Sequence, residues 1–208
     1  MLAGMARFGV DTEYAIGVSM PEIRAIGAST VKSHDLAEEL WATGLHEARI
    51  LASIVDEPRL VTKEQCDRWA LDFNSWDIVD QVCGNLFDRT QHANQLAHEW
   101  SEREEEFVKR ASFALIAWMA VHRKKDPDEL FLDYLPLIDR EADDPRSFVR
   151  KAVNWALRQI GKRSAFLHSP AVKLALELAS DDDATRRWIG SDAVKELQSD
   201  KIRARLSL

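Results

Sequence analysis

The sequence predicts an all-α fold, and three observations support that prediction. Apolar residues recur with the 3.6-residue period of amphipathic helices along the chain, and the two-residue alternation of strands is almost absent. Only 8 Gly and 6 Pro occur among 208 residues, and the Pro mostly lie between periodic segments. The helices pair at intervals of roughly 35–45 residues, which indicates an α-solenoid of degenerate repeats. A compact orthogonal bundle of the same helices is the alternative.

The composition bounds the class of protein. With 46% apolar and 30% charged residues, the chain has the composition of a soluble globular protein. We expect one repeat domain over residues 1–208, in which residues 1–16 are irregular or form a short N-terminal cap. The net charge of −7 argues against wholesale wrapping of nucleic acid but allows a local basic surface.

The location of the protein is predicted from what the sequence contains and what it lacks. The longest apolar run, residues 113–121, is too short to span a membrane, and the N-terminus has no signal-peptide layout. Cys66 and Cys83 do not form a CxxC motif, and isolated cysteines in helical segments are typical of reduced thiols. We therefore expect a cytoplasmic protein that has no contact with membranes.

Helix starts divide the first half of the chain. Pro21 fits the first turn of a helix, and Ser19 precedes it as a cap. Thr62 begins a capping box, and Asn74 or Ser75 caps the following helix. We therefore expect helices over residues 21–30, 35–43, 46–56, 63–72 and 76–88.

The second half has the same organisation. Ser101 and Glu104 have capping-box spacing, which predicts a long helix beginning at residue 102. Residues 124–127 form a linker. We expect helices over residues 91–100, 102–122, 128–140 and 147–163, and short helices within 169–179, 184–189 and 192–197.

The segment 147–163 has two unlike faces when read as a helix. The face expected to be buried consists of Val149, Val153, Ala156 and Ile160. The opposite face, within roughly an 80° arc, consists of Phe148, Lys151, Trp155, Arg158 and Lys162. No acid lies between Arg146 and His168, so this basic face is expected to bind an anion. Packing of the Trp at the edge of the core, beside solvated cations, is an equally simple interpretation.

A second stretch, residues 74–80, combines polar and aromatic side chains. Trp76 and Asp80 share a helix face because they are four residues apart, and this face continues through Cys83 and Phe87. A carboxylate in such apolar surroundings needs a partner, a water or a chemical role, and a structural salt bridge is the simpler explanation for Asp80 alone. Asp77 is explained as a favourable charge near a helix N-terminus.

A third stretch, residues 107–111, places Arg110 in the first half of a long helix. A guanidinium there has the fork geometry to pair with Asp80 or with a phosphate.

In order along the chain, five segments resemble the AlkD-type DNA alkylation repair family, the HEAT-like-repeat alkylpurine DNA glycosylases. They cover about residues 15–165 and read GVSMPEIR (17–24), LHEAR (45–49), SWDIVD (75–80), FVKRA (107–111) and FVRKAVNWALR (148–158). The resemblance implies a right-handed solenoid of HEAT-like repeats whose concave basic groove holds duplex DNA. It also implies excision of cationic N3- and N7-alkylated purines without flipping of the base.

The resemblance assigns roles to individual residues. Trp76, Asp80 and Trp155 match the residues of the family's catalytic cleft, and Arg110 matches a DNA-contacting arginine. An ionised Asp80 would stabilise the positive charge that develops on the deoxyribose and orient the attacking water. The two Trp rings would attract the same cation. The DNA-binding residues are then expected to be Arg110, Phe148, Lys151, Arg158 and Lys162.

Two departures and two alternatives accompany this hypothesis. Only a short segment precedes Gly17, and the net charge is acidic for a protein that binds DNA tightly. A DNA-binding or protein-scaffold solenoid without catalysis is the main alternative. A metal-dependent hydrolase is disfavoured because the six His lack HxxxH or HExxH spacing, and no Gly-rich phosphate loop occurs. We expect a monomer that uses no metal and no cofactor.

Overall fold

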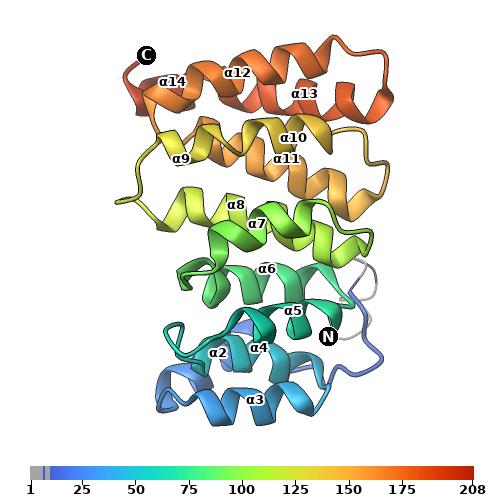
Figure 1. Cartoon of the computed structure of the whole chain (residues 1–208), viewed down its shortest axis with the longest axis vertical. Coiled ribbons are helices and arrows are strands. Elements are labelled where there is room, and N and C mark those ends of the chain that lie inside the picture. The colour runs from blue at the N-terminus through green and yellow to red at the C-terminus, as the bar shows by residue number, and fades with distance from the viewer. Residues whose placement is uncertain (1–6, 8–9) are drawn as a thin grey trace. The chain divides into compact units, whose positions relative to one another are not determined.

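The computed structural model describes residue 7 and residues 10–208, and in these residues it contains helices and no strand (Figure 1). The α-helices are α2 Met20–Ser29, α3 His34–Ala42, α4 His46–Val55, α5 Lys63–Leu71, α6 Trp76–Asn85, α7 Ala93–Ser101, α8 Glu106–His122, α9 Glu129–Leu132, α10 Leu135–Arg140, α11 Ser147–Gly161, α12 Ala165–Ala179, α13 Ala184–Leu197 and α14 Asp200–Leu206. A 3-10 helix, η1 Phe87–Arg89, follows α6. The all-α prediction is confirmed.

The chain divides into two compact units, unit 1 (Met1–Ala93) and unit 2 (Asn94–Leu208). The irregular segment expected over residues 1–16 lies partly outside the described residues, and residues 10–19 contain neither helix nor strand. The expectation of one domain over residues 1–208 stays a prediction.

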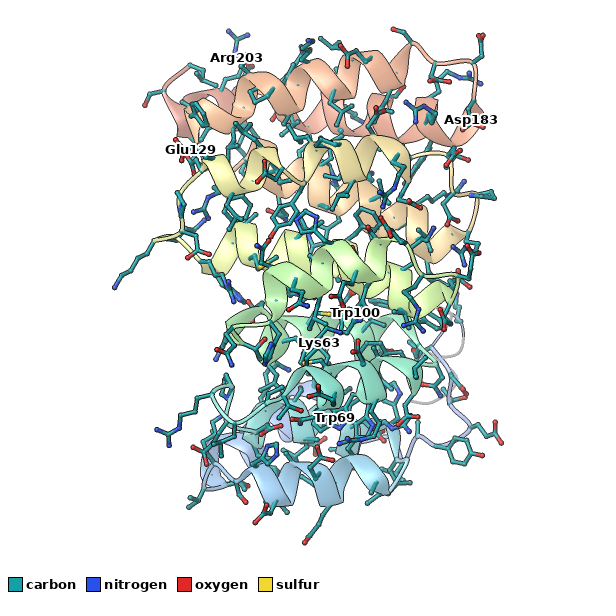
Figure 2. All side chains as sticks on the ribbon, viewed as in Figure 1. Lys63, Trp69, Trp100, Glu129, Asp183 and Arg203 are labelled. Carbon is teal, nitrogen blue, oxygen red and sulfur yellow. The ribbon has the colours of Figure 1, made fainter. Side chains whose placement is uncertain are left out.

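The core of unit 1 forms around a pair of stacked tryptophans. Trp41 of α3 and Trp69 of α5 lie with ring centroids 4.0 Å apart and 3° between their planes. Phe87 packs on Trp69 at 6.1 Å, and all three side chains are buried. Figure 2 labels Trp69 among the helices of this unit. Because each large aromatic removes about 150–250 Å² from water, this cluster supplies much of the hydrophobic stabilisation.

Two of the predicted helix starts in unit 1 are confirmed in detail. The backbone N–H and the hydroxyl of Ser19 both donate to Glu22 Oε2, at 2.9 and 2.6 Å, immediately before α2. The Thr62 hydroxyl accepts from the backbone N–H of Gln65 at 3.1 Å, immediately before α5. Side-chain caps of this kind satisfy N–H groups that have no partner within the helix.

The capping box predicted at Ser101 is wrong. Ser101 is the last residue of α7, and α8 begins only at Glu106. The Ser101 hydroxyl donates to the carbonyl of His98 at 2.7 Å and accepts from Arg140 at 2.8 Å. The apolar pattern of α7 therefore continues to Ser101, and a short turn, not a cap, separates the two helices.

Two further boundaries in unit 2 differ from the prediction. The helix predicted over residues 128–140 is divided into α9 and α10, and Pro136 lies in the first turn of α10. Proline lacks an N–H and its ring crowds the preceding turn, so it disfavours the helix interior and fits the first turn of a new helix. The helices predicted over 184–189 and 192–197 form the single helix α13, in which Gly190 packs against α12. Gly190 is required by that close packing and does not end the helix.

The remaining differences are smaller. The helix predicted over residues 76–88 ends at Asn85 and is followed by η1, and α12 begins at Ala165, several residues before the predicted start. The short helix α14 is absent from the prediction.

Both cysteines are free, as predicted, and both are buried. Burial raises the pKa of the Cys66 thiol to about 12, and the nearby carboxylates of Asp67 and Asp56 act in the same direction. No disulfide constrains unit 1, whose stability therefore depends on packing and hydrogen bonds.

In unit 2 the central helix is α8, which packs extensively against α11. Its side chains are buried on nearly every face, including Phe113, Leu115 and Ile116. Trp100 of α7, labelled in Figure 2, is also buried in this unit. The helices α12 and α13 form a second closely packed pair.

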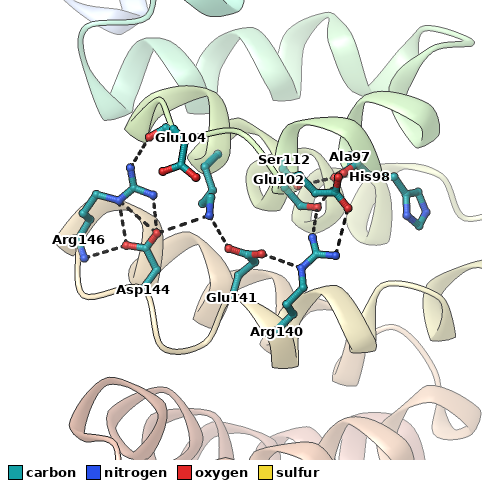
Figure 3. A network of polar contacts seen from close by, with 11 residues as sticks. Ala97, His98, Glu102, Glu104, Ser112, Arg140, Glu141, Asp144 and Arg146 are labelled. Carbon is teal, nitrogen blue, oxygen red and sulfur yellow. Dashed lines mark hydrogen bonds and ion pairs between the residues drawn. The ribbon is translucent and has the colours of Figure 1, made fainter.

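A network of ion pairs connects α8 with the segment between α10 and α11 (Figure 3). The ammonium of Lys109, a largely buried side chain of α8, lies 2.5 Å from Glu141 and 3.9 Å from Asp144. Arg140 pairs with Glu141 at 2.7 Å, and Arg146 pairs with Asp144 at 2.5 Å. Burial opposes ionisation of Asp144, but the hydrogen bonds from Arg146 outweigh it and lower the pKa of this carboxyl. The network thereby fixes the N-terminus of α11 against α8.

Candidate functional site

The apolar face of α11 is buried as predicted. Val149, Val153, Ala156 and Ile160 are all 0% exposed. Since α8 covers this helix, the basic face predicted on the other side has a fixed orientation within unit 2.

Both aromatic residues of the predicted basic face contact α8. Phe148 packs against Phe107 with ring centroids 5.6 Å apart, and Trp155 meets Trp118 edge-on at 5.4 Å and 83°. Phe148 and Trp155 are half-buried. Each ring therefore keeps part of its surface in solvent while packing holds its orientation, which a platform for a sugar or base requires.

The cations of the predicted basic face are not equivalent. Lys151 is exposed to solvent. Arg158 and Lys162 each lie 2.6 Å from a carboxylate oxygen of Glu196, on α13. The expectation that no acid pairs these cations is therefore wrong for Arg158 and Lys162. The segment itself contains no acid, but Glu196 follows these cations 34–38 residues later in the sequence.

This pairing belongs to a regular ladder between α11 and α13. The Arg150 guanidinium lies over the ring of Trp188 at 5.0 Å. One turn later Asn154 donates to Asp192 at 2.7 Å, and a further turn later Arg158 pairs with Glu196. The contacts recur every four residues on both helices, as expected for parallel neighbours. The matching spacing of 150, 154, 158 and 188, 192, 196 is the sequence signal that could have identified it.

Arg110 connects α8 with α11 inside unit 2. Its side chain is 5% exposed, and its Nη1 donates to the backbone carbonyl of Phe148 at 2.7 Å. This bond fixes the residue that begins the predicted DNA-binding face. The predicted contact between Arg110 and DNA stays a prediction, and little of the guanidinium surface faces solvent.

In unit 1, α6 has one buried face and one partly exposed face. Ile78, Val79 and Val82 are buried, whereas Trp76 and Asp80 are half-buried. Cys83 and Phe87 are completely buried, and Phe87 belongs to η1 rather than to α6. The predicted apolar surroundings therefore lie toward the C-terminal end of the helix, and the Trp76–Asp80 end is nearer to solvent.

The N-terminus of α6 is anchored by interactions that the local sequence pattern does not predict. His46, a buried residue of α4, lies with its Nε2 2.9 Å from Asp77 Oδ2, and the Ser75 hydroxyl donates to the other carboxylate oxygen. Burial disfavours the charged form of Asp77, but these hydrogen bonds outweigh burial and lower its pKa. The effect is to hold the first turn of α6, which carries Trp76, in a fixed position.

Glu47 anchors the segment that precedes α2. Its carboxylate accepts from the backbone N–H groups of Ile16, Gly17 and Val18 at 2.9, 2.7 and 3.2 Å. Glu47 is only 4% exposed. Burial alone would raise its pKa, but the backbone hydrogen bonds outweigh burial, so the pKa is lowered. The matched segments 17–24 and 45–49 are thus joined by one carboxylate.

Replacing Glu47 with Ala is expected to lower the free energy of unfolding at pH 7 by about 1–3 kcal/mol, because three N–H groups lose their acceptor. A carboxyl whose pKa is lowered by folding stabilises the native state above its unfolded pKa, and that stabilisation is lost as pH falls through the folded pKa. Urea unfolding of wild type and variant at pH 7 and below pH 4 measures both effects. The difference should shrink in acid, and Glu39→Ala, at an exposed position of α3, is the control. A difference that is independent of pH would contradict the role given to the charge.

The predicted site residues are divided between the two units. Trp76 and Asp80 belong to unit 1, and Arg110, Phe148, Lys151, Trp155, Arg158 and Lys162 belong to unit 2. Their convergence on one site stays a prediction.

Within the described residues, neither a membrane-spanning helix nor a metal-binding cluster of side chains is found. None of the helices in the described ranges is long and apolar enough to cross a lipid bilayer. In the same residues, no group of three or more His, Cys, Asp or Glu side chains is arranged to hold a metal ion.

Comparisons with known proteins give a consistent result. A family model described as DNA alkylation repair enzyme matches residues 2–197. Among solved structures, the chain is similar to a protein described as belonging to a new family related to the HEAT-like repeat DNA glycosylases with affinity for branched DNA structures. That similarity has a TM-score of 0.80 at 20% identity and covers 99% of this chain and 89% of the other. A search of curated protein sequences finds no match. The fold is therefore that of the HEAT-like repeat DNA glycosylases.

Proposed function

Because the chain belongs to the DNA alkylation repair enzyme family, we propose that it is a monofunctional DNA glycosylase that releases N3- and N7-alkylated purines from duplex DNA. The observation that carries this proposal is the placement of Asp80. It lies one helical turn from Trp76, and both side chains are half-buried on a helix whose opposite face is completely buried. A carboxylate and an indole ring in that arrangement suit a developing sugar cation.

The reaction requires little acid catalysis from the protein. An alkylated purine already carries a positive charge, so it departs with the electron pair of the N-glycosidic bond without prior protonation. Positive charge then develops at C1′ of the deoxyribose. The Asp80 carboxylate stabilises that charge and accepts a hydrogen bond from the water that attacks C1′. Trp76 and Trp155 pack against the sugar, and their ring faces attract the same cation.

The DNA backbone is bound by the face of α11. Lys151 is the exposed cation of this face, and Arg158 and Lys162 contact phosphates after exchanging Glu196 for phosphate oxygens. Phe148 and Arg110 define the N-terminal end of the surface. Contacts of this kind give affinity without preference for sequence, which suits a lesion that occurs at any position.

The experiment that tests the proposal is single-turnover release of 7-methylguanine and 3-methyladenine from methylated duplex DNA by the wild-type protein. Release above the spontaneous rate supports a glycosylase. No release, with duplex binding intact, rejects catalysis on these bases and supports the second candidate function.

That second candidate is binding of branched DNA without base excision. The observation favouring it is the pairing of Arg158 and Lys162 with Glu196, which reduces the positive charge that α11 offers to a regular duplex. The similar solved structure belongs to a family described as having affinity for branched DNA. Comparing the dissociation constants for a four-way junction and a linear duplex of equal length distinguishes the two functions, since a glycosylase of duplex DNA needs no preference for the junction.

Replacing Glu196 with Gln is expected to tighten duplex binding, because it removes the carboxylate that competes with phosphate for Lys162 and Arg158, although Asp192 remains 3.7 Å from Arg158. The slope of log K against log salt should change little, because the same phosphate contacts form in the wild type once Glu196 has been exchanged. Glu177→Gln, an exposed position of α12, makes the same change of charge and is the control. Equal affinities of the two variants would mean that the α11 cations do not face DNA.

A further inference from the structure

Unit 1 contains an open pocket of about 640 Å³ that lies away from the Trp76–Asp80 end of α6. Its lining residues are Lys32, Asp56, Glu57, Pro58, Arg59, Arg89 and Gln91. They come from the segments just before α3, just after α4 and around the end of η1. None of these lining residues belongs to α6, and Arg89 and Gln91 follow the C-terminal end of that helix, whereas Trp76 lies at its N-terminal end.

The two acids of the pocket already have partners. Asp56 is 1% exposed, and its carboxylate binds His34 Nδ1 at 2.8 Å, the Gln65 side-chain amide at 2.8 Å and the backbone N–H of Glu57 at 2.7 Å. Glu57 pairs with Arg59 at 2.8 Å. Neither carboxylate is therefore available to neutralise the remaining cations fully.

Those remaining cations are Lys32 and Arg89. The Lys32 ammonium donates to the carbonyl of Ile54, at the C-terminus of α4. Lys32 and Arg89 line the same pocket. Burial and the charge of Arg89 lower the pKa of Lys32, and the charge of Asp56 opposes this change without cancelling it. The Arg89 side chain is 57% exposed, and its Nε lies 3.9 Å from Asp88, too far for a hydrogen bond. Two cations held close together in an open pocket would both be stabilised by an anion.

We propose that this pocket binds a phosphate group between Lys32 and Arg89, with the Gln91 amide as a further donor. The planar guanidinium of Arg89 has the fork geometry for two phosphate oxygens, and the ammonium of Lys32 supplies a point charge. The phosphate comes from the DNA backbone or from a free nucleotide. A phosphate of the DNA backbone rests on the proposed function, and binding it here would add a DNA contact to those proposed for α6 and α11.

The experiment compares the double variant Lys32→Gln/Arg89→Gln with Lys173→Gln/Arg203→Gln, which makes the same change of charge at exposed positions of α12 and α14. Binding to a linear duplex and to a four-way junction is measured over a range of salt concentrations. The pocket variant is expected to lose about tenfold in affinity and to flatten the salt dependence by about 0.9 relative to its control. Thermal unfolding followed by circular dichroism checks that both variants fold.

A second arm titrates inorganic phosphate and dAMP into each protein and follows backbone amide chemical shifts around Arg89. If phosphate or dAMP changes these chemical shifts in the wild type but not in the pocket variant, and DNA binding is the same in both, the pocket is assigned to a free phosphate compound. If the wild type binds no DNA but still binds phosphate at Arg89, the proposed function fails while the pocket stands. If the pocket variant and its control behave alike toward duplex, junction, phosphate and dAMP, the pocket proposal is overturned.

Discussion

Replacing Asp80 with Asn is expected to lower the single-turnover rate of 7-methylguanine release by about 100- to 1,000-fold. The substitution keeps the shape of the side chain and removes the negative charge that opposes the cation developing at C1′. Loss of one preorganised electrostatic contact to a transition state costs about this factor in other enzymes. Affinity for unmodified duplex should change little, because the contribution of Asp80 appears as the glycosidic bond breaks.

The control for this variant is Asp35→Asn, which removes an exposed acid from the first turn of α3 in the same unit. Both variants should unfold cooperatively at temperatures close to that of the wild type. Release of 7-methylguanine by Asp80→Asn at a rate near that of Asp35→Asn would contradict the catalytic role of the carboxylate. It would also favour a structural role for Asp80.

Replacing Gly190 with Ala is expected to lower the free energy of unfolding by about 3 kcal/mol. A Cβ at this position would lie within 2.6 Å of backbone atoms of Ala175, Leu178 and Ala179 in α12. Backbone atoms cannot move aside as the end of a flexible side chain can, so α12 and α13 would have to separate. Urea unfolding followed by circular dichroism measures the loss.

The matched control is Ser191→Ala, at the exposed neighbouring position of α13. Alanine has the higher helix propensity, so this control should be neutral or slightly stabilising. A Gly190→Ala variant as stable as the wild type would mean that α12 and α13 leave room for a Cβ at this position.

The helices were predictable where the pattern is local. The Ser19 and Thr62 starts depend on residues three positions apart, and both are found as expected. The prediction failed at Ser101 and at Gly190, where two interpretations of the same residues exist. Ser followed three residues later by Glu occurs at a helix end as well as at a start, and glycine serves close packing as well as chain reversal. Tertiary contacts decide between them, and these are not visible in a short window of sequence.

The candidate site was likewise predictable where the pattern is local, and not where it depends on contacts between helices. The buried stripe of α11 follows from its period, and all four of its residues are buried. Glu196, which pairs with Arg158 and Lys162, lies beyond an intervening helix, so inspection of one segment could not reveal it. The contact between His46 and Asp77 also joins separate helices, and it was missed for the same reason. The family resemblance, by contrast, is confirmed over residues 2–197 because ordered motifs carry information about tertiary structure.

The burial of Cys66 has a consequence for the chemical survival of the protein. Alkylating electrophiles react with thiolates, and a thiol with a pKa of about 12 is ionised in only about one molecule in 10⁵ at pH 7. The packed core around this sulfur also denies the reagent a path of approach. A member of a DNA alkylation repair family must persist under the same chemical exposure that damages its substrate. In the native state, therefore, alkylating agents do not inactivate the protein through Cys66, and this thiol becomes reactive only on unfolding.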